Sequence, residues 1–167
     1  ITVNYPYDAL NRLTKVASPA APDTTLTYDE TATGGPGAKG RLTTMVDAAG
    51  TTKYQYDKSG HVIPKDATLG GVTYVTQYAY NGADQLTQVT YPSGMVVNTT
   101  RNSAGQGSTG QSVTNVTTTL ASSLQYEPFG PLKGLTYGNG INETRSYDLV
   151  GRLSGITAPG KQRQIFG

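Results

Sequence analysis

The ten residues TRSYDLVGRL, Thr144–Leu153, recur in altered form along the whole chain. Near the start, YPYDALNRL, residues 5–13, has the same types of residue in the same order. Each copy ends a strand-like run with tyrosine, continues with Asp or Asn, and three residues later has Asn, Asp or Gly. Asp and Asn accept hydrogen bonds from the backbone two residues on, and Asn, Asp and Gly enter the left-handed region at low cost. Each copy therefore predicts a type I turn closed by a bulge between two antiparallel strands.

Seven copies can be placed by their first residue, which we call the anchor residue. The anchors of repeats 1 to 7 are Tyr7, Tyr28, Tyr56, Tyr80, Arg101, Tyr126 and Tyr147, which lie 21 to 28 residues apart. We call the residue after the anchor the acceptor residue, and the residue three positions further the turn residue. The pairs that form the clearest turn signature are Asp8 and Asn11, Asp57 and Gly60, Asn81 and Asp84, and Asp148 and Gly151. Repeat 2 is split by the insertion ETATGGPGAK, residues 30–39, which we expect to form a flexible loop.

A second turn follows in several copies, as at residues 47–50, 92–94 and 138–140, so each copy consists of two strands and two turns. The sequence therefore predicts an all-β chain of repetitive antiparallel β-hairpins that form one curved strip, with almost no helix. We expect residues 1–167 to be a single array of about seven repeats, cut from a longer repeat protein. One ribbon is marginally stable alone, so repeats must stack, and bare strand edges pair with other chains. Edge-to-edge assembly and closure into a barrel-like body are both open.

The composition narrows the classes of function. The formal net charge is +2, from 13 basic and 11 acidic side chains, which is too balanced for a nucleic-acid-binding surface. No apolar run reaches membrane-spanning length, so we expect no membrane span. The chain has no cysteine and one histidine, His61, so we expect no metal site and no cofactor. We also expect the arginines beside the turns, Arg12, Arg41, Arg145 and Arg152, to form exposed ion pairs worth about 0–1 kcal/mol each.

Two features resemble reactive sites but have simpler explanations. GITAPGKQ, residues 155–162, departs from a phosphate-binding loop because Gln162 cannot supply the metal-binding hydroxyl. The recurring acids at the acceptor position resemble the paired carboxylates of a glycosidase. Asn81 and Asn102 occupy the same position and cannot ionise, so we expect the acids to cap their own turns. We therefore predict that the chain is not an enzyme.

The densest group of tyrosines lies between residues 54 and 91. Tyr54 and Tyr56, and likewise Tyr78 and Tyr80, stand two residues apart, so each pair shares one face of a strand. These four residues are candidate contacts for a glycan or for an enclosed polypeptide. The alternative is packing between neighbouring strands, which contributes about 0.2–1 kcal/mol per pair.

The copies YDLVGRLSGI (147–156), YDALNRLTKV (7–16), YNGADQLTQVTYPSG (80–94) and LTYGNGINETRSYDLVGRL (135–153) resemble YD repeats. These repeats define the rearrangement-hotspot (RHS) family, which includes the shells of insecticidal toxin-complex proteins and of teneurins. The resemblance extends to about residue 157 and implies a β-sheet strip that spirals into a hollow shell, which in bacterial members encloses a C-terminal toxin. It implies a structural role in a secreted or cell-surface bacterial system. The implied partners are neighbouring YD repeats, copies of the chain paired through strand edges, and an enclosed toxin polypeptide.

The chain departs from the family in two ways. A complete shell needs many more than seven repeats, and the Asp-Pro motif of the family's cleavage region does not occur in this sequence. Self-cleavage is therefore not implied for this chain. A carbohydrate- or receptor-binding β-module that uses the tyrosine-rich face is the alternative function.

Overall fold

The computed structural model describes residues 2–113, 117–128, 130–159 and 164–165. These residues are all-β apart from one helix of four residues, α1 (Thr31–Gly34), which confirms the expected fold class. They form two compact units, which we describe separately. The first consists of Ile1–Tyr80 and Thr90–Ser93, and the second of Asn81–Val89 and Gly94–Gly167.

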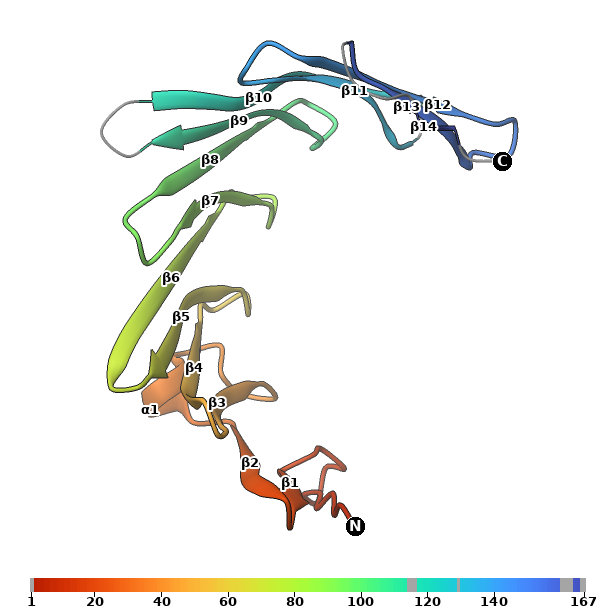
Figure 1. The fold of residues 1–167 in the computed structure, drawn as a ribbon. Coiled ribbons are helices and arrows are strands. Elements are labelled where there is room, and N and C mark those ends of the chain that lie inside the picture. Colours follow the sequence, from red (N-terminus) through yellow and green to blue (C-terminus); the bar gives the residue numbers. More distant parts are fainter. Residues whose placement is uncertain (1, 114–116, 129, 160–163, 166–167) are drawn as a thin grey trace. The chain divides into compact units, whose positions relative to one another are not determined.

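The first compact unit is a run of antiparallel strands that pair in chain order (Figure 1). Its strands are β1 (Lys15–Ser18), β2 (Ala21–Tyr28), β3 (Leu42–Val46), β4 (Gly50–Tyr56), β5 (Val62–Leu69) and β6 (Val72–Tyr80). An isolated bridge between Tyr7 and Leu13 precedes β1. Strands β2, β4 and β6 all end at an anchor tyrosine because the YD turn follows that residue directly. The repeat therefore sets the length and the end of every second strand.

The second compact unit continues the same hairpin pattern. Its strands are β7 (Leu86–Thr90, of which Thr90 belongs to the first unit), β8 (Val96–Arg101), β9 (Gly107–Val113), β10 (Thr117–Tyr126), β11 (Leu132–Tyr137), β12 (Asn142–Tyr147), β13 (Leu153–Thr157) and β14 (Gln164–Ile165). Strands β8 to β14 pair antiparallel with their neighbours in sequence. The segment of weakest repeat character, residues 103–124, contains β9 and most of β10, so it also forms regular strands where it is described.

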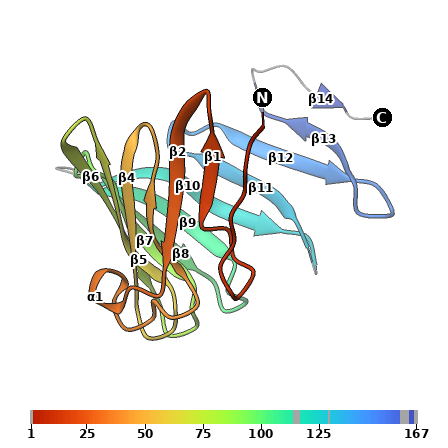
Figure 2. The same ribbon diagram turned by 90° about the horizontal axis from the view of Figure 1, so that it is seen from below.

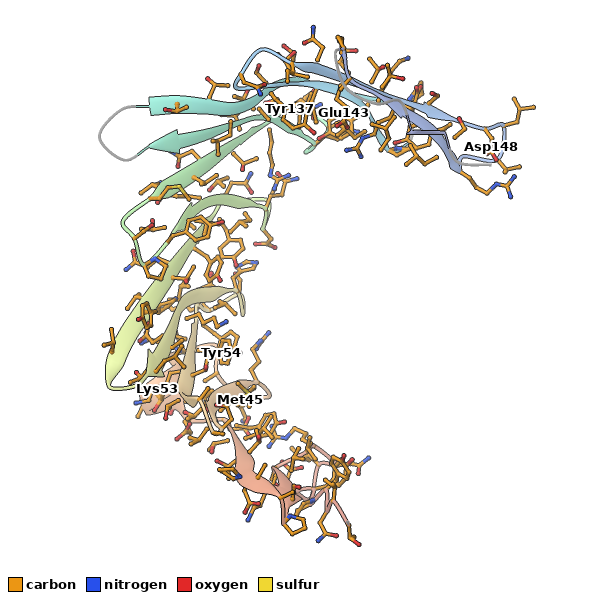
Figure 3. All side chains as sticks on the ribbon, in the orientation of Figure 1. Met45, Lys53, Tyr54, Tyr137, Glu143 and Asp148 are labelled. Atoms are coloured by element: carbon orange, nitrogen blue, oxygen red, sulfur yellow. The ribbon has the colours of Figure 1, made fainter. Side chains whose placement is uncertain are left out.

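The alternation of side chains gives the sheet of the first compact unit two different faces. Met45 pairs with Thr52, and Tyr54 pairs with Lys65, so these residues share one face. Figure 3 shows Met45 and Tyr54 on the side opposite Lys53. Along β2 and β6, half-buried residues alternate with exposed ones. One face therefore carries the bulkier, partly buried side chains.

Residues 30–39, the inserted segment of repeat 2, do not form the flexible loop that the sequence predicts. They fold back onto β3 and β4 as α1 and tight turns, at the end of the strands where the YD turns lie (Figure 2). Ala38 and Thr43 are fully buried there, and Tyr56 is 8% exposed. The carboxylate of Glu30 accepts hydrogen bonds from the hydroxyls of Thr43 and Thr44, both at 2.7 Å. The prediction failed because the segment packs through glycine and alanine, which leave no apolar periodicity to read.

Each compact unit is open within the described residues. In the first, the pairing runs from β1 to β6 without a return contact, and in the second it runs on to β14 in the same way. The barrel-like alternative is therefore wrong for each unit taken by itself. No helix in the described part of the chain is long and apolar enough to cross a membrane.

Candidate functional site

The YD turn is held by the side chain of the acceptor residue. Asp8 Oδ1 accepts hydrogen bonds from the backbone amides of Leu10 and Arg12, both at 2.9 Å. The acceptors that bind the amide four residues on in this way are Asp8, Asp57, Asn81, Asn102 and Asp148. The turn residues with positive φ are Asn11, Gly60, Asp84, Gly105 and Gly151. A carboxylate or an amide thus makes the same turn, because only one oxygen atom is required.

The second polar atom of the acceptor binds a side chain four residues later, which we call the partner residue. Asp8 receives Arg12 Nε at 2.7 Å, Asp57 lies 2.9 Å from His61 Nδ1, and Asp148 receives Arg152 Nε at 2.7 Å. Where the acceptor is Asn, the partner is Gln: Asn81 Nδ2 donates to Gln85 Oε1 at 3.0 Å, and Asn102 Nδ2 donates to Gln106 Oε1 at 3.1 Å. The two positions therefore form matched pairs, in which an acid meets a base and an amide meets an amide.

The anchor side chain connects each repeat to the one before it. Tyr56 donates its hydroxyl hydrogen to the carbonyl oxygen of Leu42 at 2.7 Å. Leu42 is the residue directly after the partner position of repeat 2, which we call the return residue. The equivalent bonds run from Tyr28 to Leu13, Tyr80 to Val62, Tyr126 to Gly107 and Tyr147 to Leu132, at 2.7–3.1 Å. We call this bond the clasp.

The clasp lies where the strand ladder between repeats has stopped. The pairing between β3 and β4 extends from Val46↔Thr51 to Thr44↔Lys53, so it ends two residues short of Leu42. The pairing between β5 and β6 likewise ends at Pro64↔Gln77 and does not reach Val62. A backbone carbonyl that is removed from water needs a donor. The long tyrosine side chain supplies that donor across the gap.

Repeat 5 makes the clasp without a tyrosine. Its anchor is Arg101, whose Nη2 donates to the carbonyl oxygen of Leu86 at 2.9 Å, while Nη1 donates to Gly105 at 3.0 Å. Leu86 is the return residue of repeat 4, so the acceptor is the equivalent one. Arg101 Nε is buried and has no hydrogen-bond partner among the described residues. The site therefore requires a long donor at the anchor, and an aromatic ring is not essential.

In the first compact unit the partner residues also lie against the next anchor ring. The Arg12 guanidinium carbon is 4.4 Å from the centroid of the Tyr28 ring, and that of Arg41 is 5.6 Å from the Tyr56 ring. The His61 ring stacks on Tyr80 with its centroid 4.4 Å away. Arginine and imidazole bind aromatic faces through the negative face of the ring. These contacts differ from the exposed rim ion pairs expected of Arg12 and Arg41; Arg152, which is 81% exposed, matches that description.

Hydrogen bonds to the carboxylates lower the pKa values of the acceptor acids. In Asp8 and Asp148 the backbone amide of the partner residue has the largest effect, and in Asp29 and Asp57 it is the side chain of Arg12 and of His61. General acid catalysis near neutral pH requires a raised carboxyl pKa. These acids therefore stay ionised and serve the turns.

The four candidate tyrosine contacts divide into two kinds. Tyr56 and Tyr80 are anchors whose hydroxyls are used in clasps, and burial raises the pKa of both. Tyr54 and Tyr78 are half-buried on the strands that lead to those anchors. The hydroxyls of Tyr56 and Tyr80 are thus directed at the backbone, and only Tyr54 and Tyr78 are candidates for a free phenolic surface.

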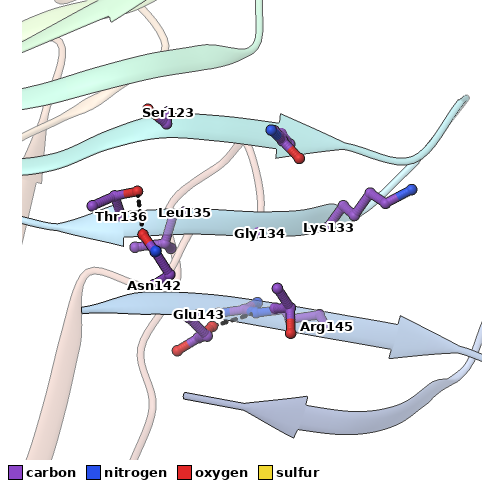
Figure 4. A pocket seen from close by; sticks show the side chains of 10 residues that line it. Ser123, Lys133, Gly134, Leu135, Thr136, Asn142, Glu143 and Arg145 are labelled. Atoms are coloured by element: carbon purple, nitrogen blue, oxygen red, sulfur yellow. Dashed lines mark hydrogen bonds and ion pairs between the residues drawn. The ribbon is translucent and has the colours of Figure 1, made fainter. Parts of the chain in front are cut away.

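A hollow of about 390 Å³ lies between β10, β11 and β12 of the second compact unit (Figure 4). Glu143 Oε1 accepts a hydrogen bond from Arg145 Nε at 2.8 Å, and Glu143 Oε2 accepts one from the Tyr137 hydroxyl at 2.7 Å. The Tyr137 hydroxyl lowers the pKa of Glu143. Glu143 is the one carboxylate in this lining, so the hollow does not present the carboxylate pair of a glycosidase.

Two other motifs from the sequence bind no ligand in the described structure. In the glycine-rich insertion the backbone amide of Gly40 donates to Asp29 Oδ1, so the chain's own carboxylate takes the place of a phosphate. Part of GITAPGKQ lies outside the described residues. Among the residues that are described, no group of three His, Cys, Asp or Glu side chains could hold a metal ion.

Comparison with known proteins places these features. A family model described as RHS Repeat matches residues 38–70, which contain the Tyr56 clasp and the Asp57 turn. No curated protein matches the chain.

Three solved structures are similar in fold. They are TcdB2-TccC3-Cdc42 (TM-score 0.73, 19% identity), TcdB2-TccC3 (0.74, 19%) and the Photorhabdus luminescens Tc holotoxin pore (0.74, 20%). Each match covers 94% of this chain and 9% of the other chain, so this chain spans about a tenth of the length of those proteins. Residues 38–70 are thus an RHS repeat, and over nearly its whole length the chain resembles the YD-repeat (RHS) family.

Proposed function

We propose that this chain is a structural segment of a β-shell that encloses or presents a toxin or effector in a secreted or surface-exposed bacterial system. The observation that supports this most is the likeness to TcdB2-TccC3, which covers 94% of this chain and only 9% of that one. A short piece that matches so completely within a long chain fits the role of a wall segment. The partners that we propose are neighbouring YD repeats, copies of this chain paired through strand edges, and an enclosed toxin polypeptide.

The clasp suits this role because it holds repeats in register without a second layer of structure. Each clasp joins one anchor side chain to the backbone of the previous repeat, so the acceptor is independent of sequence. The acceptor acids are engaged in turns, and for this reason we propose that the segment has no catalysis of its own. Stability then depends on contact between neighbouring repeats, as in other repeat proteins.

A chimera tests the proposal. The matching stretch of a TcdB2-TccC3-type protein is replaced by residues 1–157 of this chain, and protease protection of the enclosed polypeptide is measured. We expect the chimera to assemble and to protect that polypeptide as the parent does. The matched control carries Tyr28→Phe, Tyr56→Phe and Tyr80→Phe, which remove three clasp hydroxyls and should increase cleavage. Equal protection in both chimeras would contradict a role for the clasps, and an assembled chimera that leaves the polypeptide exposed would contradict the shell function.

Binding of a glycan or a receptor has less support. Tyr56 and Tyr80 hold the backbone through their hydroxyls, so only Tyr54 and Tyr78 of the tyrosine-rich face have hydroxyls that clasps do not use. Glycan-array binding that disappears in Tyr54→Ala and Tyr78→Ala, with the fold retained, would favour this function over the structural one.

A further inference from the structure

The partner residue occupies a defined place between two YD turns. In repeat 1, Arg12 lies over the Tyr28 ring and binds two carboxylates, Asp8 of its own turn and Asp29 of the next, each at 2.7 Å. The Arg12 side chain is 22% exposed there. A planar guanidinium can bind a carboxylate with its edge while its face stacks on a ring. The place between successive turns is therefore suited to a guanidinium.

Repeat 6 lacks this side chain. Its turn has Glu127 at the acceptor position and Pro131 at the partner position, and the short proline ring cannot reach the next turn. A hollow of about 440 Å³ is found at this place, and its lining includes Glu127, Pro131, Tyr147 and Asp148. The residues correspond in position to Asp8, Arg12, Tyr28 and Asp29 of repeats 1 and 2. The hollow therefore lies where the other turns hold a cation.

The lining has the charge that a cation needs. It contains two carboxylates and the Tyr147 side chain, and no basic residue. Hydrogen bonds from the backbone amide and the side chain of Arg152 lower the pKa of Asp148, so this group is ionised at neutral pH. The nearest counter-charges lie outside the lining: Lys133 Nζ is 3.4 Å from Glu127 Oε1, and Arg152 Nε is 2.7 Å from Asp148 Oδ2.

These existing pairs leave room for a further cation. The Lys133 and Arg152 side chains are 54% and 81% exposed, so both are held loosely in solvent. Asp29 shows that one carboxylate in this position serves two donors, since it binds both the Gly40 amide and Arg12. The clasp does not compete, because the Tyr147 hydroxyl donates to Leu132 and leaves the ring face to other contacts.

We propose that the hollow between the turns of repeats 6 and 7 binds an arginine side chain of a partner polypeptide, in place of the partner residue that Pro131 replaces. The guanidinium would lie against the Tyr147 ring between Glu127 and Asp148, as Arg12 lies against Tyr28 between Asp8 and Asp29. This site is independent of the shell function, because it rests on the internal comparison between repeats.

The direct test is an NMR titration of the full chain with N-acetyl-arginine amide, observed at the Tyr147 ring and the Asp148 amide. N-acetyl-citrulline amide, which has the same shape without the charge, is the matched ligand control. We expect saturable shifts at these two groups with the arginine derivative, and shifts at least fivefold smaller with the citrulline derivative. Equal shifts with both compounds, or no saturation, would overturn the proposal.

Variants at position 131 separate this site from general surface binding. Pro131→Arg supplies the missing partner residue from the chain itself, so we expect the arginine-dependent shifts to disappear and the melting temperature to rise. Pro131→Ala removes the proline without filling the hollow and should leave the shifts in place. Asp148→Asn keeps an acceptor that repeats 4 and 5 already use, and should weaken binding several-fold. Unchanged binding in both Pro131→Arg and Asp148→Asn would refute the site.

Discussion

The junctions of the two compact units share a backbone design and differ in the chemistry around the anchor. In the first unit, charged or imidazole side chains lie against the next anchor ring: Arg12 on Tyr28, Arg41 on Tyr56 and His61 on Tyr80. In the second unit the partner residues are Gln85, Gln106 and Pro131, and none of these carries a charge. The clasp to the preceding backbone carbonyl is nevertheless present in both units.

This difference separates what a repeat requires from what it tolerates. The acceptor of the clasp is a backbone carbonyl, which every sequence supplies, and Arg101 shows that even the donor can change. The ring partner varies from arginine through histidine and glutamine to proline while the turn and the clasp persist. We infer that the hydrogen bonds of the turn and the clasp set the geometry, and that ring contacts add stability locally.

The largest effect is expected at the one anchor that is buried. Tyr56 is 8% exposed and packs beneath the inserted segment, so Tyr56→Ala removes a clasp and leaves a cavity in the core of the first unit. We expect a loss of about 3–5 kcal/mol in the free energy of unfolding, measured by urea denaturation. The same change at Tyr147, which is only half-buried, should cost clearly less.

The control Tyr56→Phe keeps the ring and removes only the hydroxyl that binds Leu42. We expect it to cost about 1–3 kcal/mol, because the carbonyl loses its donor in a partly buried place. A loss equal to that of Tyr56→Ala would mean that the ring contributes nothing, and would contradict the division into clasp and ring contact.

Two turn glycines compare the units in a second way. Gly60 has φ +89°, and a Cβ at this position would lie 2.0 Å from Arg41 Nη2. Gly151 has φ +83° but no neighbouring atom within 4 Å of such a Cβ. Both alanine variants pay the left-handed cost of about 1–2 kcal/mol. Gly60→Ala should cost about 1 kcal/mol or more beyond Gly151→Ala, since Arg41 must move.

The free energies of unfolding from urea denaturation of Gly60→Ala and Gly151→Ala test this. An Arg41→Ala background should remove the difference between them, because the crowded side chain is then absent. Equal costs in the wild-type background would show that Arg41 does not pack against the turn as the structure has it.

The sequence was sufficient to predict the repeat and its hairpins, because the turn depends on residue types that recur at fixed offsets. An acceptor at one position and a residue that tolerates positive φ three positions later identify the reversal without knowledge of the partner strand. The inserted segment was mispredicted, since Gly34 and Ala38 are buried by close contact with Thr43 and Tyr56 and not by an apolar pattern.

The clasp could not be read from the sequence, because its acceptor is a backbone carbonyl that leaves no side-chain signature. The Tyr residue recurs, but nothing in the letters shows that the strand ladder stops short of Leu42. A usable signal was present in the partner position, where Asp occurs with Arg or His, and Asn occurs with Gln. Matched chemistry at a fixed spacing of four residues indicates direct contact, and would have placed His61 against Asp57.

The next prediction concerns the anchor that is not a tyrosine. Arg101→Tyr should keep a donor to the Leu86 carbonyl and remove the buried, unpartnered Nε, at the loss of the bond to Gly105. An orphaned buried donor costs about 1–3 kcal/mol and a hydrogen bond contributes about 0.5–1.5 kcal/mol. We therefore expect the free energy of unfolding to rise by up to about 1 kcal/mol, measured by urea denaturation. Arg101→Ala, which removes the clasp, should lower it.

The smallest effect is expected for the matched pair Asp148 and Arg152, which lies in solvent. Asp148→Asn alone turns an amide donor or a less basic oxygen toward the Arg152 guanidinium, so it should destabilise the turn. Adding Arg152→Gln recreates the pair found at Asn81 and Gln85, and should recover most of the loss. Urea denaturation of the two single variants and the double variant at neutral pH forms a double-mutant cycle, in which independent effects would contradict the matching.

The pH dependence of this cycle distinguishes the charged pair from its amide equivalent. Folding lowers the pKa of Asp148, so its contribution is present above the unfolded value of about 3.9 and is lost as the pH falls through the folded value. The double variant has no carboxylate at this turn, so the difference in stability between wild type and double variant should shrink between about pH 4 and lower values. A difference that stays constant over that range would mean that the turn depends on the hydrogen-bonded shape of the acceptor alone. In that case the acid–base pairs of repeats 1, 3 and 7 and the amide pairs of repeats 4 and 5 would be energetically equivalent, and the contrast between the two compact units would reside entirely in the contacts of the anchor rings.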